Sequence, residues 1–258
     1  MISKMFGIAP MIVLAGLALS SAAWATCSNA SLSGTYGFVD GGTDSSGTPT
    51  TIVGQATFDS TTATFSGIET ISQDGVVGSV SLTGKYAMAS NCSGKGTVTV
   101  DKNTNPIYFV VTSTGVLFVN GKTGGTTGGF GVAQGSPSCT NAGVKGSFGF
   151  QATGAFLAGA PATGPVHFIG ELALTVNTSG DGVIGGEMAG SEDGTIFTFA
   201  EEPVTGSYTV ATDCRGTATI TPKGRSEMHF SLVVVDGGKE ILAIETDADT
   251  VVSGTLQR

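Results

Sequence analysis

Hydrophobic and polar residues alternate along this chain in short runs that end at turn signals. The alternation has the two-residue period of a β-strand, whose successive side chains point to opposite faces of a sheet. Asp74-Gly75 and Asn120-Gly121 are two of the Asp-Gly and Asn-Gly pairs between runs, and such pairs favour tight hairpin turns. A long apolar run typical of a helix occurs only within the first 25 residues. The rest of the chain is therefore predicted to be all-β.

The runs predict eight or nine short strands in each half of the chain. They are residues 34–39, 51–58, 64–71, 76–82, 85–89, 96–100, 107–112, 116–120 and 129–134, then 146–152, 166–176, 183–190, 196–200, 206–211, 217–221, 228–235, 240–245 and 251–256. Their short connections predict an antiparallel meander, which avoids exposed edges by closing into a barrel. We expect two tandem antiparallel meander β-barrels of about eight strands each. Two-sheet β-sandwiches are the alternative.

The two halves repeat one another. LSGTYGF at residues 32–38 is answered by VKGSFGF at 144–150, and LTGKYAMASNCSGKGTVTV at 82–100 by VTGSYTVATDCRGTATITP at 204–222. A repeat of this length is a domain rather than a solenoid unit. We therefore expect one β-barrel domain over residues 26–136 and a second over residues 137–258.

The N-terminus has the features of a secretory signal peptide. Lys4 precedes an apolar stretch, which ends in small residues and an A-x-A site at Ala23-Trp24-Ala25. The apolar stretch is shorter than a membrane span requires. We expect residues 1–25 to be removed, leaving an exported chain without an integral membrane segment, in the periplasm or the extracellular space.

All four cysteines lie beyond this segment, and an even number of cysteines in an exported chain predicts disulfides. Cys27 and Cys92 hold the same places in the first copy as Cys139 and Cys214 in the second. The duplication therefore predicts the pairs Cys27–Cys92 and Cys139–Cys214.

The repeated motifs carry a resemblance. LSGTYGF, GSYTVATDCRGTATI and the closing DADTVVSGTLQR resemble a group of secreted proteins of environmental bacteria built on G-x-Y and D-C-x-G-T units. Asn91 replaces the Asp of that pattern in the first copy, whereas Asp213 retains it in the second. The resemblance implies no activity. Its barrel is similar in outline to calycin and allene-oxide-cyclase barrels, by fold analogy alone.

Charge restricts the class of partner. The chain carries a formal net charge of −9, and no cluster of Lys or Arg is present to bind a phosphate backbone. Nucleic acid is therefore not expected as a partner, whereas a small apolar ligand or another envelope protein is compatible with the composition.

No motif for catalysis, a metal or a cofactor is present. The sequence has neither G-x-S-x-G nor a phosphate-binding loop, and no CxxC or HxxxH pair. His167 and Glu171 lie about 13 Å apart along a strand, whereas Glu227 and His229 are about 6.6 Å apart. Residues 40–47 resemble a calcium loop that lacks its closing acidic residue. We expect no catalytic residues, metal or cofactor.

Aromatic residues recur at matching positions in both copies and are expected to fill the barrel interiors or to line a small apolar cavity. These residues are Tyr36, Phe38, Tyr86, Phe148, Phe150 and Tyr208. The sequence thus predicts an exported, non-catalytic β-barrel protein that serves as a binding or structural module. A small-barrel enzyme of cyclase or isomerase type, acting on an apolar ligand, and a cell-surface or matrix component remain as alternatives.

Overall fold

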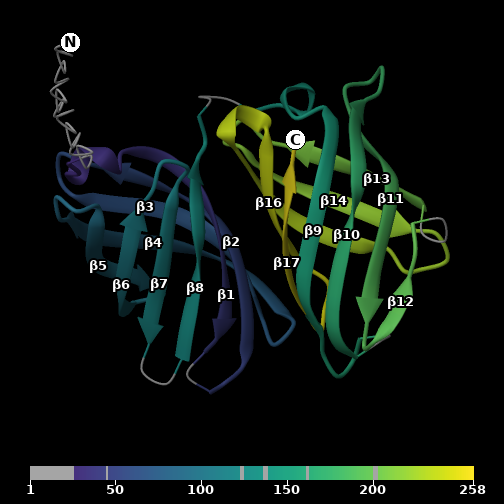
Figure 1. Cartoon of the computed structure of the whole chain (residues 1–258), viewed down its shortest axis with the longest axis horizontal. Coiled ribbons are helices and arrows are strands. Elements are labelled where there is room, and N and C mark those ends of the chain that lie inside the picture. The colour runs from purple at the N-terminus through teal and green to yellow at the C-terminus, as the bar shows by residue number, and fades with distance from the viewer. Residues whose placement is uncertain (1–25, 45, 123–124, 136–138, 161–162, 200–202) are drawn as a thin grey trace, which may run out of the picture.

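The computed structural model places two closed antiparallel β-barrels side by side (Figure 1). It describes residues 26–258 except 45, 123–124, 136–138, 161–162 and 200–202. The predicted signal peptide and the predicted boundary between residues 136 and 137 lie outside the described residues. The prediction of two tandem meander barrels is confirmed, and the sandwich alternative is wrong because each sheet closes on itself.

Barrel 1 is a meander in which each strand pairs with the next and the last pairs with the first. A complete circuit of this kind leaves no exposed sheet edge. Its strands are β1 (Gly34–Thr43), β2 (Pro49–Asp59), β3 (Thr64–Gln73), β4 (Val76–Met88), β5 (Ser93–Val100), β6 (Asn103–Val111), β7 (Val116–Lys122) and β8 (Gly125–Ala133).

Barrel 2 repeats this plan, with β9 closing onto β17 and one additional short strand, β12, at the edge of β11. Its strands are β9 (Gly146–Phe156), β10 (Gly164–Val176), β11 (Gly182–Glu192), β12 (Thr195–Phe197), β13 (Pro203–Val210), β14 (Arg215–Pro222), β15 (Met228–Val235), β16 (Glu240–Glu245) and β17 (Thr250–Gln257). The two circuits are topologically equivalent, so the duplication seen in the motifs extends over the whole fold.

Two details of the predicted strands are wrong. The runs at 76–82 and 85–89 form one continuous strand, β4, because the Gly84 between them stays paired with both Phe65 and Val98. Asn120 and Gly121 lie within β7 rather than in a turn, paired with Thr127 and Thr126 of β8. The turn motif is overridden because the pairing with β8 continues through it to Lys122.

The interiors of the barrels are filled by aromatic side chains from alternate strand positions, and glycine makes room for them. A Cβ added to Gly54 would lie 2.5 Å from the Phe38 ring, and one added to Gly170 would lie within van der Waals overlap of the Phe150 ring. In barrel 1 the rings also contact one another, as in the edge-to-face pair of Phe58 and Tyr86 at 5.5 Å. Aromatic packing of this kind gives each barrel its own core.

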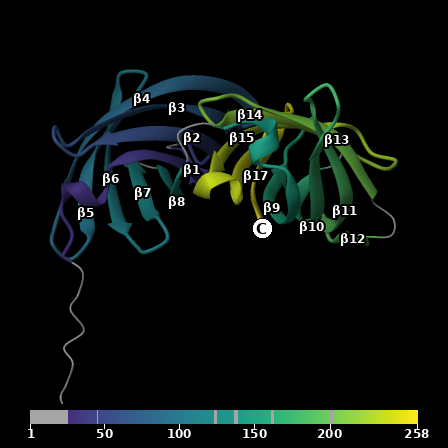
Figure 2. The same ribbon diagram turned by 90° about the horizontal axis from the view of Figure 1, so that it is seen from above.

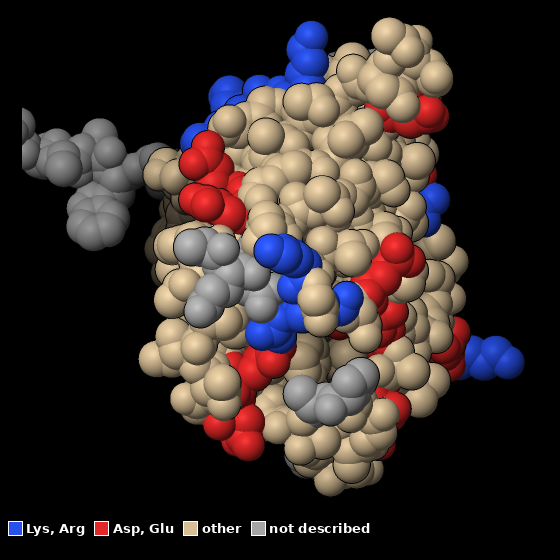
Figure 3. All heavy atoms as spheres, turned by 90° about the vertical axis from the view of Figure 1, so that its right-hand side faces the viewer, with Lys and Arg blue, Asp and Glu red and all other residues tan. Residues whose placement is uncertain are grey.

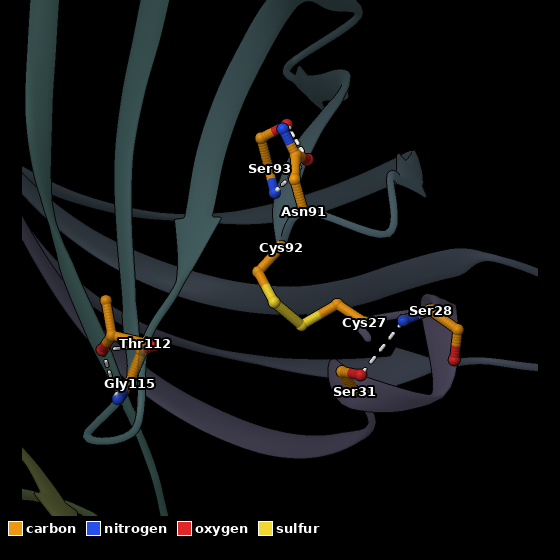
Figure 4. The surroundings of a disulfide bond; sticks show 8 residues. All are labelled: Cys27, Ser28, Ser31, Asn91, Cys92, Ser93, Thr112 and Gly115. Atoms are coloured by element: carbon orange, nitrogen blue, oxygen red, sulfur yellow. Dashed lines mark hydrogen bonds between the residues drawn. A yellow bond between two sulfur atoms is a disulfide. The ribbon is translucent and has the colours of Figure 1, made fainter. Parts of the chain in front are cut away.

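Each barrel is closed at one end by a short 3-10 helix, here called its stopper, which a disulfide links to the sheet. The helices are η1 (Asn29–Ser31) and η2 (Asn141–Gly143). Cys27 bonds to Cys92 and Cys139 bonds to Cys214, each pair with 4.9 Å between Cα atoms, so the predicted disulfides are confirmed. Figure 4 shows the first disulfide joining the segment before η1 to the turn that opens β5.

The two barrels meet at an apolar interface between their outer faces (Figure 2). Barrel 1 contributes side chains from β1, β2 and β8, and barrel 2 contributes side chains from β15 and β16. The approach is close at Gly37, where an added Cβ would lie 2.5 Å from Val235 and 2.6 Å from Val233. The buried members of this interface are Val39, Val53, Val233, Val235, Leu242 and Ile244.

Polar contacts fix the orientation of one barrel on the other. The Ser72 hydroxyl donates to the Thr250 carbonyl at 2.5 Å, and the main-chain N–H of Gly237 donates to the Gln134 carbonyl at 2.7 Å. Ser72 and Gln134 are both buried at this interface, where an unsatisfied polar group would be costly. The barrels therefore form one packed body.

Candidate functional site

The aromatic residues expected in barrel 1 surround an interior cavity of about 100 Å³. Tyr36, Phe38 and Tyr86 all line it. The Tyr86 hydroxyl, however, points into the stopper and donates to the carbonyls of Leu32 at 2.8 Å and Asn29 at 3.3 Å. It therefore closes the barrel end instead of projecting into the cavity.

Barrel 2 encloses a smaller cavity of about 60 Å³, which Phe150 and Tyr208 line. Phe148 is fully buried nearby, with the Arg258 guanidinium 4.8 Å from its ring centroid. The Tyr208 hydroxyl donates to the Asn141 carbonyl at 2.9 Å, which repeats the contact that Tyr86 makes in barrel 1. Both tyrosine hydroxyls thus hold a 3-10 stopper in place.

Neither cavity has the size of an ordinary ligand pocket. Pockets for drug-sized molecules measure about 300–1,000 Å³, several times more than either interior. A larger apolar molecule does not fit inside either barrel in this conformation. Any interior ligand is limited to a few non-hydrogen atoms.

The interior of barrel 1 carries a cluster of three polar side chains that the sequence analysis missed. Asp40 on β1, Glu69 on β3 and Asn120 on β7 all line its cavity. Asp40 is 5% exposed and Glu69 is 7% exposed. The sequence contains a signal for this position, because Asp40 alternates with the aromatic residues in Tyr36-x-Phe38-x-Asp40. The sequence analysis instead assigned residues 40–47 to a segment that resembles a calcium loop.

The two carboxyl groups are strongly perturbed by their surroundings. Burial raises the pKa of Asp40 to about 6, although hydrogen bonds from Thr127 and from the Gly41 backbone act in the opposite direction. Burial also raises the pKa of Glu69 to about 7, and the charge of Asp40 adds to the effect. Thr127 donates to Asp40 Oδ2 at 2.8 Å, whereas Oδ1 has no partner among the described residues.

The equivalent interior of barrel 2 lacks this pair. Strand register assigns Ala152 to the position of Asp40, Met188 to that of Glu69 and Glu245 to that of Asn120. Pairing between neighbouring strands establishes the last two equivalences. The row Phe38, Gly54 and Glu69 in barrel 1 corresponds to Phe150, Gly170 and Met188 in barrel 2. The row Gly96, Ile107 and Asn120 corresponds in the same way to Ala218, Phe230 and Glu245.

Glu245 is the single acidic residue that replaces this group in barrel 2. It is 2% exposed, and burial raises its pKa to about 8, with a further contribution from the neighbouring Asp247. Glu245 does not line the cavity of barrel 2. The two barrels therefore share one fold but differ in the chemistry of their interiors.

The predicted pair of Glu227 and His229 is brought together on the surface. His229 Nε2 lies 3.0 Å from Glu227 Oε1, and Nδ1 lies 2.7 Å from Asp247 Oδ1. The hydrogen bond to Asp247 is the main cause that raises the pKa of His229. Its side chain is half exposed, so the triad favours a protonated surface imidazole.

The remaining polar candidates have local structural contacts. His167 and Glu171 are exposed on β10, four residues apart on the same outer face. In the loop that resembles a calcium site, Asp44 Oδ1 accepts from the N–H groups of Ser46 and Thr48 at 2.7 and 2.9 Å. Among the described residues, no group of three or more His, Cys, Asp and Glu side chains is arranged to hold a metal ion.

The outer face of β6 and β7 is apolar and exposed. Tyr108 pairs with Val119 and Val110 pairs with Leu117 across these strands. All four side chains are 47–56% exposed, and a shallow groove of about 710 Å³ runs beside them. Adjacent exposed apolar residues of this kind mark interaction sites more often than isolated ones do.

The same face of barrel 2 is buried. Register makes Val110 equivalent to Val233, Leu117 to Leu242 and Val119 to Ile244. All three barrel 2 residues are 2% exposed or less, because they pack against barrel 1. The equivalent strand pairs on β15 and β16 are Ser231 with Ile244 and Val233 with Leu242.

Charged side chains are more mixed than the net charge suggests. Figure 3, which faces the β10–β13 side of barrel 2, shows acidic and basic side chains interspersed on one surface. A partly buried ion pair joins Arg225 to Glu192 at 2.5 Å, with the guanidinium stacked 4.1 Å from the Phe197 ring centroid. Within the described residues, no helix has the length and hydrophobicity to cross a membrane.

Comparison with known proteins adds no functional information. No family model and no curated protein matches the chain. Among solved structures, a protein of unknown function from the DUF3598 family of Nostoc punctiforme matches at 11% identity and a TM-score of 0.27, over 88% of this chain and 96% of that one. A putative AttH of Nitrosomonas europaea matches at 8% identity and a TM-score of 0.29, over 97% and 99%.

Proposed function

We propose that this protein is an exported, non-catalytic structural module that assembles with a second copy of itself through the outer face of β6 and β7. Two intrachain disulfides support export, because such bonds persist in oxidising compartments. The small interiors of about 100 and 60 Å³ favour a role exercised at the surface over carriage of an apolar ligand or cyclase-type catalysis.

One observation carries this proposal. Val110, Leu117 and Val119 occupy the positions at which barrel 2 uses Val233, Leu242 and Ile244 to bind barrel 1. The fold thus already contains an example of this face buried against another barrel. On barrel 1 the face keeps its apolar character, and no part of the chain that the structure describes covers it.

The second copy docks through the same face rather than head to tail. In a head-to-tail contact, the β6–β7 face of one copy would pack on barrel 2 of the other copy. The surface used there would be the barrel 2 equivalent of the surface that β15 and β16 contact on barrel 1. At most of those positions polar residues replace apolar ones, since Gln151 stands for Val39 and Thr255 for Phe130, whereas Ile169 keeps the apolar character of Val53. The two apolar faces match each other better, and a self-complementary contact closes as a two-fold dimer.

Sedimentation velocity over a concentration series tests the assembly. The native protein is expected to sediment as a dimer, and Leu117→Glu/Val119→Glu as a monomer, because buried unpaired carboxylates oppose association. Val76→Glu is the matched control, since Val76 is 72% exposed outside this face, and it should remain dimeric. A native protein that is monomeric at every concentration would overturn the proposal.

Export is checked separately. N-terminal sequencing of protein recovered from outside the cytoplasm should begin at Thr26, after cleavage behind Ala25. A chain that still begins at Met1 and remains in the membrane fraction would contradict it.

A further inference from the structure

The interior of barrel 1 contains polar side chains that its fold does not require. Barrel 2 closes with the same topology while carrying Ala152 and Met188 in place of Asp40 and Glu69. Burying a carboxyl group without a charged partner is costly. The retention of two carboxyl groups beside one cavity therefore indicates a role other than packing.

These groups face the cavity with unused hydrogen-bonding capacity. Asp40 Oδ1 and Asn120 Oδ1 are both buried without a partner among the described residues. The residues that line the cavity include Glu69 but no Lys, Arg or His. The site thus presents acceptor oxygens and negative charge, and none of its described lining residues supplies a cation to balance them.

The remainder of the cavity wall is apolar and aromatic. Phe38 lies between Asp40 and Tyr36 on the inner face of β1, so an aromatic side chain stands about 6.6 Å along the strand from the acidic residue. Tyr36, Phe58 and Tyr86 form edge-to-face contacts at 5.5–5.6 Å at the stoppered end. An elongated ligand would meet oxygens at one end and rings at the other.

We infer that the interior of barrel 1 binds a short-chain primary alkylammonium ion. Its ammonium group would donate to Asp40, Glu69 and Asn120, and its alkyl chain would lie against the aromatic wall. A cavity of about 100 Å³ holds about four non-hydrogen atoms, by comparison with roughly 150 Å³ for benzene. This inference does not rest on the proposed assembly, which uses the opposite face of the sheet.

Isothermal titration calorimetry of the native protein with n-propylammonium chloride tests the site, at about pH 8 where both carboxyl groups ionise. We expect saturable binding to one site per chain. Glu69→Gln should weaken binding by at least about tenfold, because it removes a charge-assisted hydrogen bond. Glu245→Gln is the control in barrel 2 and should bind as the native protein does.

A second variant and two control salts test the assignment further. If Glu69→Gln folds poorly, Glu69→Met places the residue of barrel 2 at this position and should also abolish binding. Sodium chloride or ammonium chloride giving the same heat as n-propylammonium would overturn the assignment to an organic cation. Absence of saturable binding to the folded native protein would overturn the site itself.

Discussion

Glu69 and Met188 occupy the same position in the two barrels. Each lies opposite a glycine of the preceding strand, Gly54 for Glu69 and Gly170 for Met188. The surrounding aromatic packing is therefore alike, while one interior holds a carboxyl group and the other a thioether. Barrel 2 provides a built-in reference for what the fold needs at this point.

The buried carboxyl group makes stability fall as pH rises. The pKa of Glu69 is about 7 in the folded state, against 4.5 for the free side chain, so folding takes up a proton between these values. Its contribution is fully present below about pH 4.5 and is lost as pH rises through 7. Glu69→Met should therefore gain up to about 3 kcal/mol relative to the native protein between pH 4.5 and pH 8.

Urea unfolding at a series of pH values measures this difference. Glu171→Gln, which changes an exposed side chain on β10, is the control and should show a much smaller trend. A Glu69→Met variant whose advantage over the native protein is the same at both ends of the range would contradict the prediction.

The hydrogen bond between the tyrosine hydroxyl and the stopper should contribute equally to the free energy of unfolding in both barrels. Tyr208→Phe removes the buried hydrogen bond to the Asn141 carbonyl, and we expect a loss of about 1–3 kcal/mol in the free energy of unfolding. Tyr86→Phe should do the same in barrel 1. Tyr108→Phe, at a 56% exposed residue, should change stability by less than about 0.5 kcal/mol. Equal effects of all three substitutions would rule out a stopper role.

Each disulfide should stabilise its own barrel more than the other. Replacing Cys139 and Cys214 together with serine opens a loop of 75 residues and is expected to cost about 2–5 kcal/mol. Hydrogen exchange should show a larger loss of protection in barrel 2 than in barrel 1, because barrel 1 is affected only through its contact with barrel 2. Peptide mapping of the native protein without reduction provides the check on pairing, and a Cys27–Cys139 peptide would refute it.

The interface between the barrels should depend on the absence of a side chain at Gly37. Gly37→Val would overlap Val233 and Val235, so we expect calorimetry to resolve two unfolding transitions where the native protein shows one. Gly41→Val is the matched control on the same strand, since its added Cβ would approach nothing closer than 3.8 Å. A single unaltered transition for Gly37→Val would show that the coupled unfolding of the two barrels does not depend on this contact.

Much of the fold could be predicted because its determinants are local. The alternation of side chains and the repeated Cys positions indicated the strands, the closed meander and both disulfides. The failure at Asn120 has a physical cause, since the pairing of β7 with β8 continues through Gly121 to Lys122 and carries the strand past the turn motif. Pairing between distant strands is not visible in a short motif.

The polar interior could not be predicted for a related reason. Asp40 and Glu69 are 29 positions apart in the sequence, and only the curvature of the closed sheet brings both to one cavity. Likewise, the equivalence of Val110 and Val233 depends on strand register. Asp247 reaches His229 from a separate turn. Each site combines residues whose proximity arises from the barrel and not from spacing along the chain.

The disulfides also determine how this chain responds to tension. A force applied at Cys27 passes directly to Cys92, and one that reaches Cys139 passes directly to Cys214. The closed loops of 65 and 75 residues carry no load, which shortens the fully stretched chain by roughly 450 Å. Under oxidising conditions, only the later strands of each barrel can be pulled out of the fold, so the disulfides reduce the maximum extension of the chain under force.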